Sequence, residues 1–324
     1  MTLSPFHIGI LAYDGAQRAA VHGLADLFTV ANGRAESRLG KAAPRIRLHH
    51  FGEEAGGIVM QPAETEAAPV RLNALILPSS LEDVSDGSGR EARHAWIRAR
   101  HGEGTVIASV CSGAFVLAQT GLLAGRRVTT HWASRNRMEK LYPDIQVDSD
   151  KLLIDSGDIM TAGGLMAWTD LGLHLVEKAL GHAIMLDTAR FLLIDPPGRE
   201  QRTYQSFQPQ LLHGDEPVLR VQHWLQQAFA SPASVSAMAA KAGLEDRTFL
   251  RRFTRATGLK PNDYLQQVRV SEARLLLETT RMPVEQIAHA VGYEDANAFR
   301  KLFIRITGLK PGEYRQRFGR HATA

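Results

Sequence analysis

Two nearly identical nine-residue stretches near the end of the chain constrain its fold most. ATGLKPNDY begins at Ala256, and ITGLKPGEY begins at Ile306, 50 positions later. The likeness extends upstream through small residues, a glycine, an aspartate and two phenylalanines. The matched pairs are Ala239 and Ala288, Gly243 and Gly292, Asp246 and Asp295, Phe249 and Phe299, and Phe253 and Phe303. The pattern predicts two copies of one small structural unit.

Each copy has the order of residues that a helix-turn-helix unit requires. Small residues in a first helix allow close packing, and Gly243 or Gly292 suits a turn because positive φ is cheap for glycine. Asp246 or Asp295 is placed to cap a second helix. The phenylalanines of that helix are four residues apart and share one buried face. In both copies, the GLKP sequence ends this helix and begins the next. We therefore predict two helix-turn-helix units.

The outward face of each predicted second helix is basic. Arg and Lys side chains bind guanine edges and phosphates, and Asn pairs with adenine. From Glu216 onward there are 17 Lys and Arg against 10 Asp and Glu, whereas the residues before it carry 21 against 24. We predict that both helices bind double-stranded DNA in neighbouring major grooves, about 34 Å apart; the alternative is a solvated basic face. The candidate DNA-binding residues are Arg247, Thr248, Arg251, Arg252, Arg255, Asn297, Arg300, Lys301 and Arg305.

The first part of the chain has a different pattern. Apolar runs at 6–13, 46–52, 74–80, 105–110 and 158–164 read as strands, and amphipathic stretches between and after them read as helices. This alternation predicts a parallel sheet covered on both faces. A segment rich in Pro, Gly, Gln and charge follows. We predict an α/β domain over 1–194, a linker over 195–215 and an all-helical domain over 216–324.

The single cysteine, Cys111, stands in VCSGAF between an apolar strand and a helix. A helix N-terminus there would favour a thiolate or a bound anion. His131 in THW is the candidate base, and backbone N–H groups of LPSS could join that of Ser112 in an oxyanion nest. Trp132 could stack on an organic cation. The predicted ligand pocket comprises Asp14, Ser79, Ser80, Cys111, Ser112, His131 and Trp132.

Two family resemblances follow from these motifs. The tail from Val218 to Phe318, with IAHAVGYEDANAFRKLFIRITGLKPGEYR, resembles the DNA-binding domain of AraC/XylS-type transcription regulators. The first part, with VCSGAF, LPSS and THW, resembles the PfpI-type, class I glutamine amidotransferase-like superfamily. The combination is similar to GlxA-like regulators. It implies a flavodoxin-like domain followed by an all-α domain, in a transcription regulator whose first domain senses a small metabolite or holds a dimer.

One departure bears on catalysis. Hydrolytic members of the superfamily place a Glu against the Cys in the first strand-to-helix loop, but YDGAQRAAVHG has Asp14 as its only carboxylate. We therefore expect a degenerate pocket and no enzyme activity. The alternative is an amidase or deglycase that also binds DNA, with Cys111 and His131 as catalytic residues. A third reading is a thiol redox sensor at Cys111.

The expected partners follow from the same resemblance. They are double-stranded promoter DNA, a small effector such as an amino acid, a betaine or another nitrogenous compound, and a second copy of the chain. RNA polymerase joins them if the chain activates transcription. His49 and His50 have no companions at metal-ligand spacing, and no phosphate-binding glycine loop occurs, so no metal or cofactor is expected. A single cysteine and the lack of a long apolar run predict a cytoplasmic protein without membrane contact.

Overall fold

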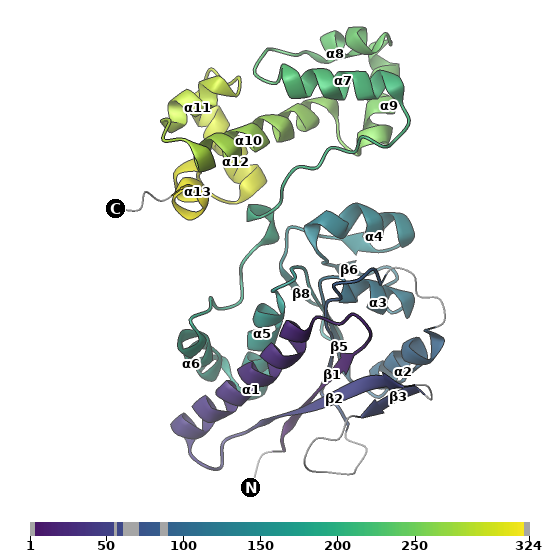
Figure 1. Ribbon diagram of the computed structural model, residues 1–324, viewed down its shortest axis with the longest axis vertical. Coiled ribbons are helices and arrows are strands. Elements are labelled where there is room, and N and C mark those ends of the chain that lie inside the picture. Colours follow the sequence, from purple (N-terminus) through teal and green to yellow (C-terminus); the bar gives the residue numbers. More distant parts are fainter. Residues whose placement is uncertain (1–3, 55–56, 61–70, 85–89, 321–324) are drawn as a thin grey trace. The chain divides into compact units, whose positions relative to one another are not determined.

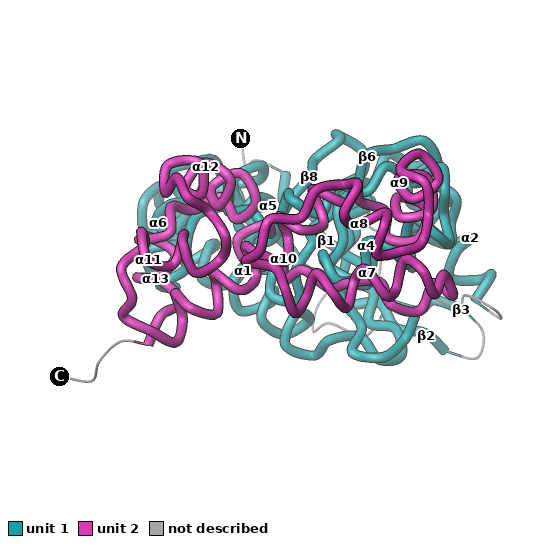
Figure 2. The backbone as a smooth tube through the Cα atoms, turned by 90° about the horizontal axis from the view of Figure 1, so that it is seen from above, with its two compact units in different colours: residues 1–201 teal, residues 202–324 magenta. Residues whose placement is uncertain are grey.

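The chain forms two compact units, residues 1–201 and residues 202–324 (Figures 1 and 2). The computed structural model describes residues 4–54, 57–60, 71–84 and 90–320. The division falls at one peptide bond inside the predicted linker, whose borders remain a prediction. Among the described residues, no helix combines the length and hydropathy that a membrane-spanning helix requires.

Unit 1 is built on a seven-stranded sheet in the order β3-β2-β1-β4-β5-β9-β8. Its five central strands are parallel, as the apolar runs predict, while β3 and β8 pair antiparallel at the two edges. A separate parallel pair, β6 and β7, lies outside this sheet. The strands are β1 (Phe6–Ala12), β2 (Ile46–Glu54), β3 (Gly57–Met60), β4 (Ala74–Leu77), β5 (Val106–Val110), β6 (Arg127–Val128), β7 (Gln146–Val147), β8 (Leu153–Asp155) and β9 (Ile159–Ala162).

Alternating side chains of the central strands enter two separate cores. Ile76 of β4 and Val110 of β5 face one core, whereas Leu75 and Ile107 face the other. Helices α1, α5 and α6 cover the first face, and α2 and α3 cover the second (Figure 1). The helices are α1 (Arg18–Leu39), α2 (Glu91–Gly102), α3 (Gly113–Gln119), α4 (Arg135–Leu141), α5 (Trp168–Leu180) and α6 (His182–Leu192). Both faces of the sheet are therefore buried.

Unit 2 consists of helices around two small cores that α10 bridges. One core contains Phe249 and Phe253, and the other contains Phe299 and Phe303; α10 contributes residues to both. Nineteen helical residues extend about 28 Å, and α9 and α12 lie toward opposite ends of α10 in both views (Figures 1 and 2). The helices are α7 (Glu216–Gln227), α8 (Val235–Ala242), α9 (Asp246–Thr257), α10 (Pro261–Thr279), α11 (Val284–Ala290), α12 (Ala296–Thr307) and α13 (Pro311–Phe318).

The sequence repeat is also a repeat of side-chain contacts. Phe253 meets the edge of Tyr264 at 5.3 Å between ring centroids, and Phe303 meets Tyr314 in the same way at 5.5 Å. Both second helices end at a glycine in the left-handed region, at φ 73° and φ 78°. Glycine adopts this left-handed conformation with less strain than other residues, and it is therefore the usual residue at such a helix end. The predicted pair of helix-turn-helix units is therefore present.

The helix caps differ between the copies. Asp295 caps α12 as predicted, since its carboxylate accepts hydrogen bonds from the backbone N–H groups of Asn297 and Ala298. Asp246 does not cap α9: it is the first helical residue, and it accepts a hydrogen bond from the Ser236 hydroxyl at 2.6 Å. The cap prediction is thus right for the second copy and wrong for the first.

Both sides of the bond between the units are fixed within their own unit. In unit 1 the Gln201 side chain is 2% exposed, donates to the Thr130 and Lys151 carbonyls at 2.9 Å and accepts from the Trp132 N–H at 3.2 Å.

In unit 2 the segment 202–207 lies against the helical bundle. The buried Arg274 guanidinium of α10 donates to the carbonyls of Arg202 and Gln205. Phe207 packs edge-on to Tyr264, with 5.0 Å between ring centroids. The first residues of unit 2 are therefore held by its long central helix.

Candidate DNA-binding surface and ligand cavity

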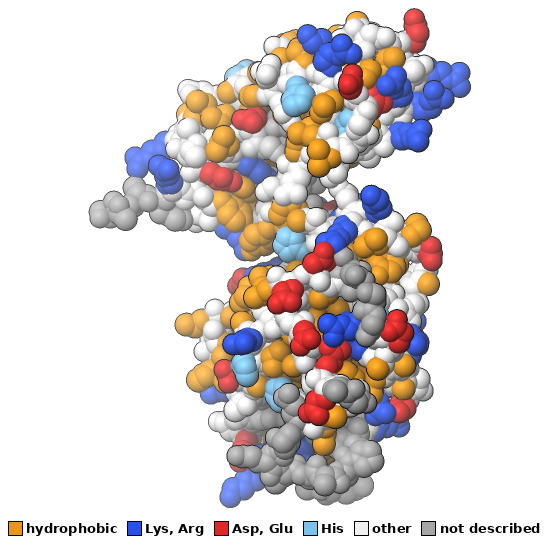
Figure 3. All heavy atoms as spheres, turned by 45° about the vertical axis from the view of Figure 1, so that its right-hand side comes forward, with side chains coloured by type: hydrophobic (Ala, Val, Ile, Leu, Met, Phe, Trp, Pro, Cys, Tyr) orange, Lys and Arg blue, Asp and Glu red, His pale blue; other side chains and the backbone are white. Residues whose placement is uncertain are grey.

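The outer face of α9 carries a stripe of cations. Arg247, Arg251 and Arg255 are exposed and four residues apart, so they share one side of the helix. Thr248 lies beside them and is half-buried. Lys and Arg side chains gather over this end of unit 2 (Figure 3). The spacing suits contacts along one major groove.

Arg252 does not belong to this stripe, although the sequence placed it there. Its guanidinium donates to both carboxylate oxygens of Asp215 at 2.8 and 2.9 Å. Asp215 also caps α7 by accepting from the Val218 N–H, and the hydrogen bond from Arg252 lowers the pKa of Asp215. The counterpart of Arg252 in the second copy is Leu302, which is only 7% exposed. Arg252 therefore fastens α9 to α7.

The outer face of α12 also carries three cations, but two of them have protein partners. Lys301 is exposed, and Arg305 donates to the Gln266 side chain at 2.8 Å. Arg300 donates to Asn297 Oδ1 at 3.0 Å and pairs with Glu285 of α11. Three of its four predicted side chains therefore already have protein partners.

The cysteine elbow of unit 1 has the predicted shape. Cys111 follows β5 directly and has φ 53°, an unusual conformation for a residue with a side chain. Gly113 begins α3, and a Cβ at that position would lie 2.5 Å from the Leu77 carbonyl oxygen. The end of β4 therefore approaches the elbow so closely that only glycine fits.

The surroundings of the thiol oppose the predicted thiolate. Cys111 is 7% exposed, and burial raises the pKa of its thiol, while contacts with Ser79 and the Ser112 N–H lower it to a smaller extent. His131 is engaged elsewhere: its Nδ1 accepts from the Ala133 N–H, and its ring lies against Trp132. None of the interactions described for these residues joins Cys111 to His131. The contacts described for Cys111 therefore do not activate it as a nucleophile.

One N–H group of the predicted oxyanion nest is occupied by a side chain. The LPSS stretch and the elbow do meet, since Ser112 Oγ donates to the Ser80 carbonyl at 3.0 Å and lies 3.1 Å from Ser79 Oγ. However, the Ser80 N–H donates to Ser112 Oγ at 2.8 Å. This N–H is therefore already paired with a serine hydroxyl.

A cavity of about 960 Å³ lies at the carboxyl end of β1 and also reaches His50 in the middle of β2. Of the seven predicted pocket residues, only Asp14 lines it. The other polar and charged side chains of the wall were not assigned to the pocket from the sequence, although Gln17 follows Asp14 in the same loop and Arg18 begins α1. These side chains are Tyr13, Gln17, Arg18, His22, His50 and Glu82.

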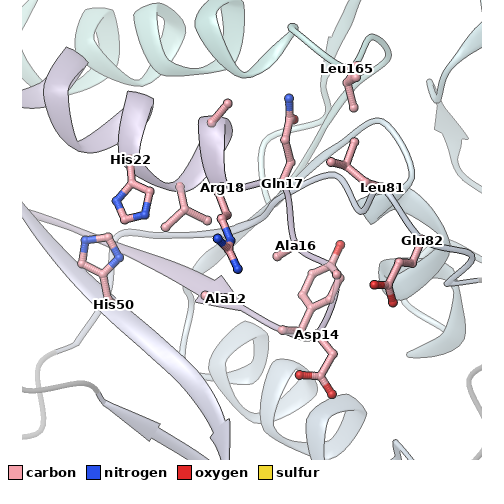
Figure 4. A pocket seen from close by; sticks show the side chains of 14 residues that line it. Ala12, Asp14, Ala16, Gln17, Arg18, His22, His50, Leu81, Glu82 and Leu165 are labelled. Atoms are coloured by element: carbon pink, nitrogen blue, oxygen red, sulfur yellow. The ribbon is translucent and has the colours of Figure 1, made fainter.

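The cavity wall presents charges of both signs (Figure 4). His22 and His50 face each other, and burial, then the neighbouring His22, lower the pKa of His50. Asp14 and Glu82 lie on the other side of Arg18. Gln17 is 5% exposed, and no group in the described residues bonds to its buried Oε1. In the described part of the chain, no three potential metal ligands come together.

Comparisons with known proteins agree with this division of the chain. Residues 56–178 match the DJ-1/PfpI family, and residues 238–317 match a helix-turn-helix domain family. The HTH-type transcriptional regulator GlxA of Rhizobium meliloti is 28% identical over 227 residues, which cover 68% of this chain and 69% of that protein. The HTH-type transcriptional regulator CdhR of Pseudomonas aeruginosa is 27% identical, over 63% of this chain and 61% of that protein.

A third relative matches a smaller part of the chain. Isonitrile hydratase of Pseudomonas putida is 33% identical over 137 residues, which cover 42% of this chain and 56% of that enzyme. The chain spans less than two thirds of CdhR and of this enzyme. The duplicated helix-turn-helix units, the elbow on a parallel sheet and both regulator matches lead to one assignment. The chain carries a DJ-1/PfpI domain followed by an AraC-type helix-turn-helix domain, and it is similar to HTH-type transcriptional regulators.

Proposed function

We propose that this protein binds promoter DNA through α9 and α12 and that a small molecule in the unit 1 cavity controls this binding. The stripe of Arg247, Arg251 and Arg255 carries the proposal, because an exposed helix face with cations at every fourth position matches a major groove. Asn297, Lys301 and Arg305 of α12 serve the second groove. Arg252 has a structural role, because its ion pair with Asp215 holds α9 against α7.

The cavity is the proposed effector site. Asp14 and Glu82 suit a positively charged nitrogen, and the unpartnered Gln17 oxygen suits a hydrogen-bond donor. Both features support a nitrogenous effector. Such a ligand controls DNA binding only if it favours one conformation of the protein over another. A homodimer, and RNA polymerase as a partner in activation, complete the proposal.

We propose no catalytic role for Cys111. The amidase or deglycase alternative needs a thiolate with a base and an orienting acid, and the raised pKa of Cys111 and the distinct contacts of His131 count against it. The partial likeness to an isonitrile hydratase makes hydrolysis and hydration the reactions to assay as controls. The burial of this thiol and its raised pKa also weaken the case for a peroxide sensor.

The full-length protein is first used to enrich the fragments that it binds from a pool of random genomic fragments. Its affinity for an enriched fragment is then measured by titration. Arg251→Ala should weaken binding to the enriched fragment by about 1–3 kcal/mol, because a base-edge or phosphate contact is lost. Arg190→Ala removes the same charge from an exposed site on α6 of unit 1 and should leave the affinity unchanged. Equal losses for the two variants, or no enriched fragment at all, would contradict the proposal.

A further inference from the structure

The two helix-turn-helix units differ at one position of their first helices. Glu285 lies in the first turn of α11, and its counterpart in the first copy is Ser236 of α8. Ser236 donates a hydrogen bond to Asp246 of its own unit, whereas Glu285 pairs with Arg300 of α12. The second copy therefore carries an additional carboxylate beside α12, the second helix of its helix-turn-helix unit.

Arg300 is held from two sides. Its guanidinium donates to Asn297 Oδ1 at 3.0 Å and to the Glu285 carboxylate. Asn297 is itself fixed, because its backbone N–H donates to Asp295 Oδ1 at 2.8 Å. The counterpart of Arg300 in α9 is Leu250, so the first copy has no equivalent arrangement.

The ion pair between Arg300 and Glu285 is exposed to solvent, so DNA can reach it and compete with it. The side chains of Arg300 and Glu285 are 39% and 58% exposed. Exposed ion pairs contribute little to stability, so a base edge with two well-placed acceptors can displace the carboxylate. A phosphate group can also form charge-assisted hydrogen bonds with a guanidinium, but at Arg300 it must displace the Glu285 carboxylate, which is another anion, so the exchange gains little. An unpaired arginine at this position would instead bind any phosphate within reach.

We propose that Glu285 is a specificity-determining residue, which withholds Arg300 from non-cognate phosphates and presents it, together with Asn297, to a matching base pair. This inference rests on the proposed function, since it assumes that α12 faces DNA. It goes beyond that function in assigning discrimination to an acidic residue of the first helix.

The test compares full-length wild-type protein with Glu285→Gln on two duplexes, a random-sequence duplex and the genomic fragment that the wild type enriches. Gln has the shape of Glu but lacks its charge. We expect Glu285→Gln to bind the random duplex about 2- to 5-fold more tightly. The slope of log K against log salt should steepen by about 0.9, as expected for one additional phosphate contact. Affinity for the enriched fragment should change less, so that discrimination falls.

Two controls separate this proposal from simpler explanations. Glu139→Gln removes the same charge from an exposed Arg–Glu pair on α4, where Arg135 and Glu139 are 2.9 Å apart, and should change neither slope nor affinity. In an Arg300→Ala background, Glu285→Gln should lose its effect on the random duplex. If the effect persists there, Glu285 acts by direct repulsion and its role in positioning Arg300 is wrong.

The possible failures are distinguishable. Wild-type protein that binds neither duplex contradicts the proposed function itself. Wild-type protein that binds and discriminates, while Glu285→Gln has the same salt slope and the same discrimination, contradicts this inference alone.

Discussion

The thiol of Cys111 is enclosed by the end of the sheet and by α3, and this enclosure governs its chemistry. The positive end of a short helix favours a thiolate, but loss of solvent favours the neutral thiol. Burial is the larger of the influences on the pKa of Cys111, and it raises that pKa. At neutral pH the side chain is therefore a small apolar group with a weak donor.

Alkylation by iodoacetamide tests this state directly. Because only the thiolate reacts, the rate for the folded protein should rise with pH through a midpoint above that measured in urea. The raised pKa also stabilises the fold below the unfolded thiol pKa, and this contribution is lost as pH rises through the folded value. Measuring the rate between pH 6 and 11, with and without urea, checks the shift. A reactive plateau already present at pH 7 would contradict it.

The residues of the DNA-binding surface and of the cavity differ in how well the sequence alone predicts their positions. The arginine stripe of α9 follows from one helix and its period, so the sequence predicts it. The partner of Arg252 is Asp215, 37 positions away, and no local pattern links them. The cavity wall combines side chains of β1, α1, β2 and three loops, and only the folded sheet brings these together.

Among the elements, the repeat was the most predictable part because its signals are local. Glycine at a left-handed helix end, proline at the next helix start and paired phenylalanines all act within a few residues. The antiparallel edge strands β3 and β8 were not predicted, since their direction depends on pairing with strands already in the sheet. The cap at α9 differed for a similar reason, because Ser236 of another helix binds Asp246.

The start of α3 offers a test of packing at the elbow. In Gly113→Ala the new Cβ would meet the carbonyl oxygens of Leu77 and Pro78 at 2.5 and 2.6 Å. Backbone atoms cannot move aside cheaply, so unit 1 should lose roughly 1–3 kcal/mol of unfolding free energy.

The matched control is Gly33→Ala in α1, where a Cβ meets no atom within 4 Å. Removing a mid-helix glycine should stabilise unit 1 by about 0.5–1 kcal/mol. Urea unfolding followed by circular dichroism measures both variants. Midpoints that shift in the same direction would mean that the approach of β4 to the elbow is not as close as described.

At the scale of the whole molecule, the connection between the units is anchored on both sides. Gln201 is held inside unit 1, and Arg202 to Phe207 are held by α10 in unit 2. Composition alone predicted a linker here, because Pro, Gly and Gln are common in flexible segments. The buried amide of Gln201 and the buried Arg274 are long-range features that composition does not report.

Limited trypsin digestion tests these anchors. Cleavage after Arg199 and Arg202 should be slow in the wild type relative to cleavage after Arg320, which is exposed at the end of unit 2. Gln201→Ala removes the side-chain hydrogen bonds and should accelerate cleavage roughly tenfold, as followed by mass spectrometry. Rapid cleavage at these sites in the wild type would show a free linker.

The duplicated units share a framework but not an outer surface. Three arginines line α9, whereas α12 carries an asparagine, a lysine and arginines with protein partners. If both helices contact DNA as proposed, the two ends of the DNA site differ in sequence, and a single chain binds the site in one orientation. Inverting such a site within a promoter reverses the direction in which the bound protein faces the transcription start, so regulatory output depends on strand polarity as well as on base sequence.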